Sequence, residues 1–134
     1  MERFALDPRL AADTEWIADW ALCTVRLMND SRFPWVVLIP RRAQVREIHD
    51  LGHGEALVLL QELQRASKGL ERIFKPDKIN IGALGNIVAQ LHVHVVARKK
   101  DDAAWPGPVW GKEGSQPYGM QARQTIIDTL VTGL

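Results

Sequence analysis

Hydrophobic and polar residues alternate in short blocks along the first third of the chain. Apolar positions at Leu22, Val25 and Leu27 lead into a polar turn, and the apolar run PWVVLIP, residues 34–40, follows it. A short run with β-branched residues and flanking prolines is typical of a buried strand. The pattern therefore predicts an antiparallel hairpin in which residues 29–33 form the turn between two strands.

Between residues 54 and 74 the hydrophobic spacing changes to that of a helix. Residues on the apolar row recur at intervals of three and four, and Glu62, Gln64, Arg65 and Lys68 lie at polar positions between them. The row consists of Leu57, Leu60, Leu63, Ser67, Leu70 and Phe74. We expect this helix to end before Pro76, because proline cannot continue a helix.

Beyond this helix the pattern predicts strands over residues 78–84 and 90–98, with Gly85 and Asn86 in the turn between them. Residues from about 103 to 119 are rich in Gly, Pro and Trp and predict an irregular but ordered segment, since tryptophans are rare in disordered tails. Residues 120–134 predict a terminal helix. Strands, a central helix and further strands favour an α+β domain with a mainly antiparallel sheet.

Composition and charge narrow the range of partners. The 134 residues suit a single domain, 1–134, and 46% hydrophobic with 25% charged residues is typical of a globular protein. The 17 Lys and Arg nearly balance the 16 Asp and Glu, so we expect no nucleic-acid or membrane partner. No signal peptide or membrane-spanning run is evident, which indicates a cytoplasmic protein. The single cysteine, Cys23, is predicted to be a small buried side chain.

Candidate chemistry is concentrated in the run QLHVHVVAR, residues 90–98. Gln90, His92 and His94 occupy alternate positions, so on a strand their side chains would share one face at a spacing of about 6–7 Å. Leu91, Val93 and Val95 would then face the other way. The row therefore predicts a polar stripe on a strand whose opposite face is buried.

Three interpretations of this stripe remain open. It could be the solvated face of a half-buried strand. It could be part of a zinc site, which would need further ligands such as His49 and His53. In the third interpretation one neutral imidazole attacks phosphorus and the other hydrogen-bonds a phosphate oxygen. The sequence GALGN, residues 82–86, favours the third, because backbone amides of a glycine turn can approach an anion closely.

The stripe and the preceding NIGALGN, residues 80–86, together resemble the signature of the histidine triad superfamily. The similarity extends to VRLMND, residues 25–30, and FPWVVLIPRRAQVREIHDL, residues 33–51, and so covers most of the chain. The resemblance implies an α+β, HIT-like fold with a five-stranded, mainly antiparallel sheet, one long central helix and a C-terminal helix. It also implies a homodimer.

The same resemblance implies a nucleotidyl hydrolase or transferase that acts at the α-phosphate of a purine nucleotide or nucleotide conjugate. By position, His92 matches the nucleophile and His94 matches a contact to the phosphate and leaving group. Asn29 or Asp30 falls where the family holds the ribose hydroxyls. Residues near the phosphate are implied to be Asn80, Gly85, Asn86, Ile87 and Val88. No metal or other cofactor is implied.

Two positions depart from the family pattern. Gln90 replaces the first histidine of the triad, and Trp35 stands where many members have a further histidine. A glutamine side chain can orient His92 by hydrogen bonding but cannot carry a proton. The alternative to an enzyme is therefore a nucleotide-binding module with weak or no turnover. For Trp105 and Trp110 we expect a lid or a strap between subunits, with base stacking as the alternative.

Overall fold

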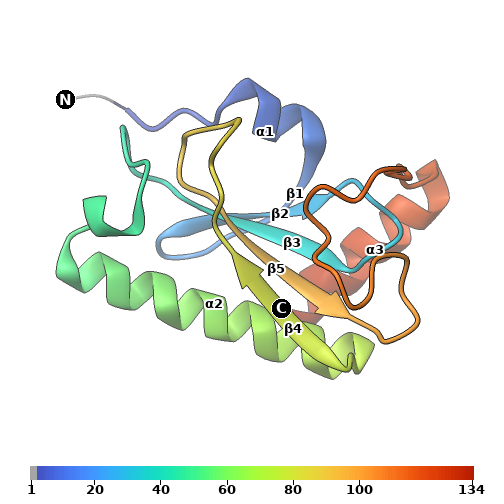
Figure 1. The fold of residues 1–134 in the computed structure, drawn as a ribbon. Helices are drawn as coiled ribbons and strands as arrows, with labels where there is room; N and C mark the ends of the chain where they lie inside the picture. The colour runs from blue at the N-terminus through green and yellow to red at the C-terminus, as the bar shows by residue number, and fades with distance from the viewer. Residues whose placement is uncertain (1–2) are drawn as a thin grey trace.

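The computed structural model describes residues 3–134, which are built around one five-stranded sheet (Figure 1). The strands are β1 (Thr14–Asp19), β2 (Cys23–Met28), β3 (Trp35–Pro40), β4 (Lys78–Gly82) and β5 (Val93–Arg98). Their order across the sheet is β1-β2-β3-β5-β4, and every neighbouring pair is antiparallel. The predicted α+β fold class, the five-stranded sheet and the β2–β3 hairpin are confirmed.

The helices are α1 (Pro8–Asp13), α2 (His53–Phe74) and α3 (Met120–Gly133), with a short 3₁₀ turn, η1 (Ile48–Asp50), before α2. The predicted central and terminal helices are thereby confirmed. Helix α2 ends where Lys75 adopts a left-handed backbone conformation with φ of 49°, and Pro76 follows directly. The pattern predicted neither α1 nor β1.

The predicted strands on either side of the glycine turn are too long. Strand β4 ends at Gly82, and β5 begins only at Val93, so residues 83–92 form a loop. Within this loop the Leu91 amide donates to the Val45 carbonyl, at 3.0 Å, and Val45 lies outside the strands. The proposed stripe of three side chains on one strand is therefore wrong at Gln90. His92 also lies in this loop, yet its ring remains beside that of His94 on β5, with ring centroids 5.0 Å apart.

Two hydrophobic layers cover the sheet, one on each face. Helices α2 and α3 pack on the first face, where Leu91, Val93 and Val95 join the larger core cluster. The second face carries a smaller cluster that includes Trp35, Val96 and Val109, and α1 and residues 99–119 lie against it. The two histidines belong to this second face. The predicted separation of the apolar and histidine faces of the strand is confirmed.

The buried face of α2 differs from the predicted apolar row. Leu59, Leu63, Ala66 and Leu70 are buried, whereas Leu57 and Leu60 are about half exposed. Glu62, expected at a polar position, is buried, and its carboxylate accepts the backbone N–H groups of Leu22 and Cys23 at 3.0 and 2.8 Å. Cys23 is fully buried as predicted, and burial raises the pKa of its thiol.

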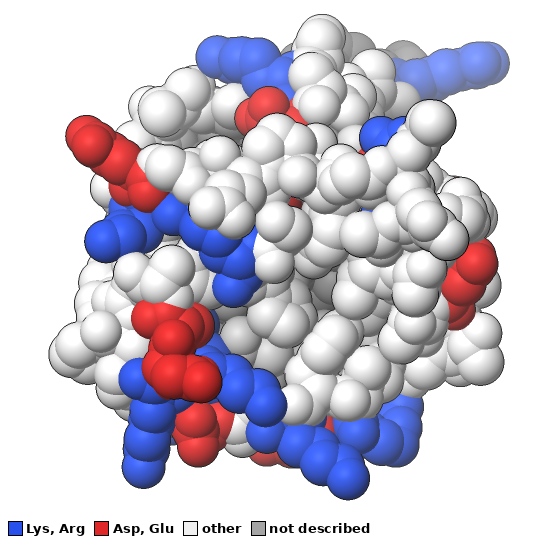
Figure 2. Space-filling view, turned by 90° about the vertical axis from the view of Figure 1, so that its right-hand side faces the viewer, with Lys and Arg blue, Asp and Glu red and all other residues white. Residues whose placement is uncertain are grey.

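Charged side chains of both signs are spread over the surface shown in Figure 2, and uncharged side chains cover most of its centre and right. This agrees with the near balance of the formal charges, which sum to +1. Among residues 3–134, no helix combines the length and apolar character needed to cross a membrane.

Candidate active site

His92 and His94 line a cavity of about 440 Å³ on the second face of the sheet. Both imidazoles are less than a tenth exposed. His94 is held centrally by backbone pairing, since it lies opposite Val37 of β3 on one side and Gly82 of β4 on the other. The other residues that line the cavity are Leu10, Asp13, Met28, Asp30, Trp35, Leu84–Val88, Val109–Lys112 and Ser115.

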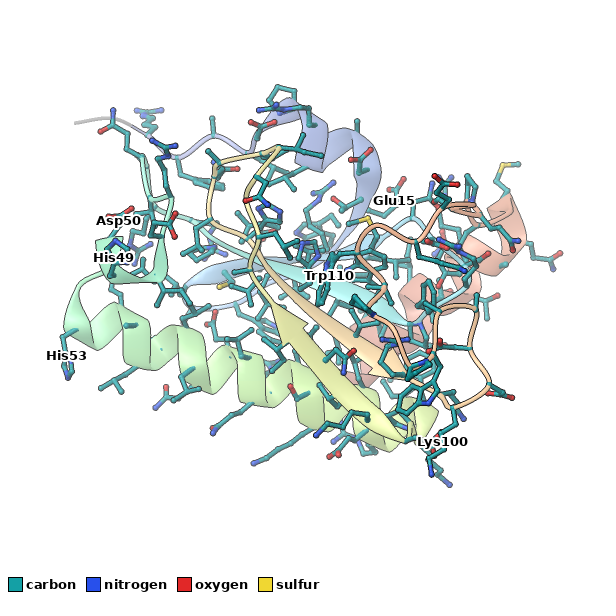
Figure 3. All side chains as sticks on the ribbon, viewed as in Figure 1. Glu15, His49, Asp50, His53, Lys100 and Trp110 are labelled. Atoms are coloured by element: carbon teal, nitrogen blue, oxygen red, sulfur yellow. The ribbon has the colours of Figure 1, made fainter. Side chains whose placement is uncertain are left out.

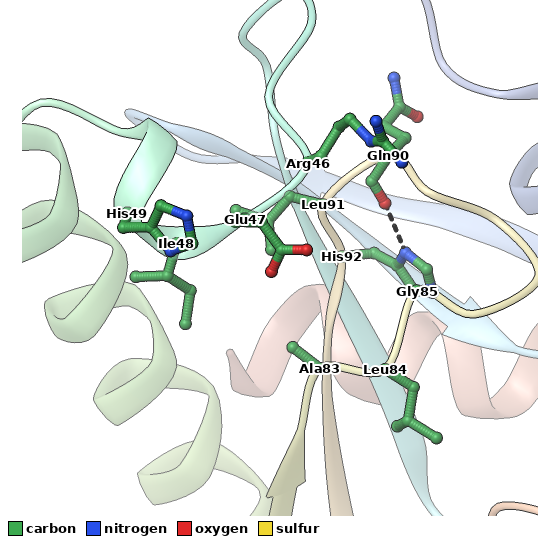
Figure 4. A pocket seen from close by; sticks show the side chains of 10 residues that line it. All are labelled: Arg46, Glu47, Ile48, His49, Ala83, Leu84, Gly85, Gln90, Leu91 and His92. Carbon is green, nitrogen blue, oxygen red and sulfur yellow. Dashed lines mark hydrogen bonds between the residues drawn. The ribbon is translucent and has the colours of Figure 1, made fainter.

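His92 has a defined tautomer when it is neutral. Its Nδ1 lies 2.7 Å from the main-chain carbonyl oxygen of Gln90 (Figure 4). A carbonyl oxygen only accepts hydrogen bonds, so Nδ1 carries the proton. The lone pair of the neutral ring is then on Nε2, as nucleophilic attack by this nitrogen requires.

His94 has an aromatic environment. The indole Nε1–H of Trp35 donates to its Nδ1 at 3.0 Å, and the centroids of the Trp35 and Trp110 rings lie 5.6 and 5.5 Å from that of His94. Burial and the neighbouring His92 lower the pKa of His94 to about 4. This imidazole is therefore uncharged at neutral pH.

The Gln90 side chain does not orient His92, which corrects the sequence prediction. Its Oε1 accepts the Asp7 amide and its Nε2 donates to the Ala5 carbonyl, both at 2.9 Å. The hydrogen bond between Gln90 and His92 uses the main-chain oxygen of Gln90. The carboxamide thus fastens the N-terminal segment to the loop, where Arg9 adds a hydrogen bond to the Ile87 carbonyl at 3.1 Å.

The glycine turn lies beside the histidines as predicted, and Gly85, Asn86, Ile87 and Val88 all line the cavity. Gly85 has a φ of +73°, a backbone conformation that residues other than glycine adopt only with strain. Ile87 is largely exposed and Val88 is buried in the smaller core cluster. The turn is therefore anchored at Val88 and open to solvent at its tip.

The polar residues predicted to contact substrate separate into two groups. Asp30 lines the cavity and forms an ion pair with Arg32 at 2.8 Å. Burial raises the pKa of Asp30, but the hydrogen bonds from Arg32 outweigh burial and hold this pKa below its usual value. Asn29 and Asn80 are not among the lining residues. Asn29 accepts the Tyr118 amide at 2.9 Å, and Asn80 accepts from Arg98 at 2.8 Å.

Residues 99–119, for which the sequence predicted a lid or a strap between subunits, supply one wall of the cavity. Val109 is buried, Trp110 packs against His94, and Lys112 and Ser115 lie at the exposed rim. The segment is fixed to the β2–β3 turn, because Arg32 donates to the carbonyls of Lys112 and Glu113. The tryptophans were the sequence feature that could have indicated this wall, but their positions relative to the histidines depend on the fold.

A second cavity of about 270 Å³ adjoins the first and shares Leu84, Gly85 and His92 with it. Figure 4 shows Arg46, Glu47 and His49 along its opposite wall. His49 and His53 lie at one end of the molecule, far from Trp110 (Figure 3). Within residues 3–134, no group of three or more His, Cys, Asp or Glu side chains has a geometry that could hold a metal ion.

Comparison with known proteins agrees with this fold. A family model described as the HIT domain matches residues 9–101. A histidine triad protein from Sinorhizobium meliloti 1021 superposes with a TM-score of 0.95 at 44% identity, over 98% of this chain and 97% of that one. A histidine triad protein from Marinobacter aquaeolei VT8 gives 0.96 at 44% identity, over 99% and 97%.

One curated relative has a named activity. The asymmetrical bis(5'-nucleosyl)-tetraphosphatase of Schizosaccharomyces pombe is 33% identical over 72 residues. The matched stretch is 50% of this chain and 39% of the relative's length.

Proposed function

This chain belongs to the HIT domain family, and we propose that it is a histidine-nucleophile enzyme that hydrolyses or transfers the nucleotidyl group of a purine nucleotide conjugate. One observation carries the proposal: His92 and His94 lie side by side in a cavity wall, next to the turn 85–88. The hydrogen bond from His92 Nδ1 to the Gln90 carbonyl also favours a free lone pair on Nε2.

In the proposed reaction His92 Nε2 attacks the α-phosphorus and forms a nitrogen–phosphorus bond. The bond from phosphorus to the leaving group breaks, and the leaving group departs with that electron pair and takes up a proton from solvent water. Water then attacks the phosphorus, the nitrogen–phosphorus bond breaks with its electron pair returning to His92 Nε2, and the attacking water loses a proton to solvent. These changes release the nucleoside monophosphate and restore His92. Backbone amides of the turn 85–88 and the His94 ring would stabilise the charge on the phosphate oxygens.

The nucleoside would occupy the apolar part of the cavity. Leu10, Met28, Val88 and Val109 offer contacts for a base, and Asp30 offers a carboxylate for the ribose hydroxyls. We give Asn29 and Asn80 supporting roles instead, because their side chains hold Tyr118 and Arg98. The tetraphosphatase relative makes dinucleoside polyphosphates one class of conjugate to test.

The decisive experiment is a substrate screen with adenosine phosphoramidates, dinucleoside polyphosphates and nucleotide sugars, run on wild type and His92→Ala in parallel. We expect turnover of one class by wild type and none by the variant. Labelled substrate followed by an alkaline quench should trap nucleotide on His92, since the nitrogen–phosphorus bond is acid-labile. Wild-type turnover by His92→Ala, or label on another residue, contradicts the assignment of the nucleophile.

Gln90 is the observation that favours a second candidate, a nucleotide-binding module with little or no turnover. Such a module would still be stabilised by ligand, by about 2.7 kcal/mol at a hundredfold excess over Kd. Thermal-shift response to AMP or GMP, combined with no turnover by wild type and Gln90→His, would favour the module. No response to any nucleotide would contradict both candidates.

We further propose that the protein is a homodimer. Strand β4 is an edge of the sheet, and its Ile81 is half exposed, as are Leu57 and Leu60 of α2. An unpaired strand edge and exposed apolar side chains are each typical of surfaces that associate. Sedimentation should give a dimer at micromolar concentration and a monomer for Ile81→Lys, with Lys78→Ala as the control. A wild-type monomer would contradict this assembly.

A further inference from the structure

Three aromatic rings enclose His94, and one of them fixes where its proton is. Trp35, Trp110 and His92 all lie with their centroids within 5.6 Å of the His94 centroid. The two tryptophans differ in one respect. Trp35 donates its indole N–H to His94 Nδ1 at 3.0 Å, whereas the buried Trp110 Nε1 has no hydrogen-bond partner among the described residues.

The Trp35 contact selects one protonation state of His94. An indole N–H can only donate, so Nδ1 must be the acceptor and the single proton of the neutral ring lies on Nε2. The imidazolium would carry protons on both nitrogens, and its Nδ1–H would then face the Trp35 N–H. Two buried donors in opposition leave both without a partner, which is unfavourable.

Trp35 is itself held in place. It begins β3, lies opposite Val96 of β5 and packs edge-on against Phe33 with ring centroids 6.4 Å apart. Its side chain is less than a tenth exposed. The indole therefore cannot easily turn away to let Nδ1 accept a proton from elsewhere.

We propose that Trp35 is a positioning residue that fixes His94 as a neutral, Nε2-protonated imidazole, so that His94 donates a constant hydrogen bond to the reacting phosphate and transfers no proton. The role toward phosphate rests on the proposed function, whereas the tautomer does not depend on it. The lowered pKa of His94 agrees with this assignment.

The charged groups around His94 do not offer it a counter-ion. Across the cavity, Asp30 is engaged by Arg32, and the remaining ionisable side chains of the lining are Asp13, Lys112 and His92 among the described residues. The strand neighbours that flank His94 in the sheet are Val37 and Gly82. Trp35 is thus the polar group in direct hydrogen-bond contact with the ring.

The test is nitrogen-15 NMR of the full chain with labelled histidine, at intervals from pH 8 to pH 5 and without substrate. His94→Gln assigns the His94 signals. In wild type we expect His94 to show a protonated Nε2 and an unprotonated Nδ1 over the whole range. Trp35→Phe removes the donor, and we expect it to populate both tautomers and to begin titrating at a higher pH than wild type.

Trp110→Phe is the matched control. It alters the other tryptophan against the same imidazole but removes an N–H that makes no hydrogen bond, so the wild-type tautomer and titration should persist. A wild-type signal with Nδ1 protonated overturns the proposal even if Trp35→Phe does not fold. Identical His94 behaviour in folded Trp35→Phe and wild type also overturns it.

Kinetics then separate this inference from the proposed function. If wild type turns over a nucleotide conjugate, the dependence of kcat on pH should show an additional ionisation on the acidic side in Trp35→Phe. Wild type and Trp110→Phe should lack this ionisation. If no conjugate is turned over, the proposed function is contradicted, whereas the NMR experiment still tests the tautomer of His94 independently.

Discussion

Strand β5 carries two buried polar side chains, His94 and Arg98, on the same face and four residues apart, yet the structure treats them in opposite ways. His94 is 6% exposed and Arg98 is 1% exposed. His94 is neutral among aromatic rings, whereas Arg98 carries the charge that a guanidinium keeps in any folded protein. The two buried groups therefore need different surroundings, because a neutral imidazole can be enclosed by aromatic rings whereas a buried charge needs hydrogen-bond acceptors.

Arg98 is surrounded by acceptors. Asp102 accepts from two of its nitrogens at 2.8 and 3.0 Å, and Asn80 and the Gly107 carbonyl each accept at 2.8 Å. The rings of Phe33 and Trp105 lie 5.7 and 5.6 Å from the guanidinium. Burial raises the pKa of Asp102, but the hydrogen bonds from Arg98 outweigh it and lower the pKa to about 2.

The two ends of strand β5 thus have different roles. The Arg98 end joins β4, β5 and the segment 99–119 through a charged network, while the His94 end presents an uncharged donor to a cavity. Substitutions at the Arg98 end should therefore affect mainly stability, and substitutions at the histidine end should affect mainly activity.

His92→Ala should give the largest effect and should separate activity from stability. Because the proposed nucleophile is lost, we expect kcat/KM to fall by at least about 10⁴-fold. Stability should fall by only about 1 kcal/mol, the scale of the hydrogen bond to the Gln90 carbonyl. Steady-state kinetics and urea unfolding measure the two quantities. A fall in stability large enough to explain the loss of activity would break the comparison.

Arg98→Met should give the largest effect on stability. It leaves the nearly buried Asp102 carboxylate without its partner, and breaking one side of a buried ion pair costs about 3–5 kcal/mol. Lys100→Met, on an exposed neighbour, should change stability by no more than about 0.5 kcal/mol. Urea unfolding compares the two variants. Equal effects would show that the Arg98 network contributes nothing particular to the fold.

The pH dependence of stability should distinguish the two ends within one protein. The pKa of His94 falls from an ordinary 6.5 to about 4 on folding, so the unfolded chain takes up this proton first as the pH is lowered. Stability should therefore be lost between pH 6.5 and pH 4, by up to about 3 kcal/mol. Asp102 has a pKa lowered from 3.8 to about 2, so its contribution is lost only below about pH 4.

His94→Gln tests that separation, because glutamine can still accept the Trp35 N–H but does not titrate. The difference between wild type and variant, measured by urea unfolding at each pH, should change between pH 6.5 and pH 4 and stay level below pH 4. A constant difference across the upper range would show that His94 titrates normally in the folded protein.

Features encoded by neighbouring residues were predictable from the sequence. The histidine pair, the glycine turn beside it and the hairpin all depend on spacing within about ten residues. Strand β1 was missed because a bulge between Trp16 and Ala18 interrupts the alternation that identifies a strand. Spacing also assigned Glu62 to a polar face, since nothing local indicates that the distant Leu22 and Cys23 amides need its carboxylate.

Gln90 shows the same limit within the candidate site. Spacing placed its side chain beside the histidines, whereas its partners are Ala5 and Asp7, more than eighty positions away in the chain. The missing triad histidine suggested a change in proton transfer. The structure shows instead that the side chain at this position faces the N-terminal segment and that only its backbone serves His92.

Substitutions at Gln90 should give the smallest effects on activity. Gln90→Ala keeps the main-chain carbonyl that accepts from His92, so we expect kcat/KM to stay within a few-fold of wild type. It removes the hydrogen bonds to Ala5 and Asp7, which should cost about 1–3 kcal/mol in urea unfolding. Gln90→His should likewise preserve activity or raise it slightly. Gln64→Ala, at an exposed position of α2, is the control and should leave both quantities near wild type.

A hundredfold loss of kcat/KM in a well-folded Gln90→Ala would contradict this expectation. It would mean that the Gln90 carboxamide turns toward the phosphate during the reaction. The assignment of the backbone to His92 and of the side chain to the N-terminal segment would then be wrong.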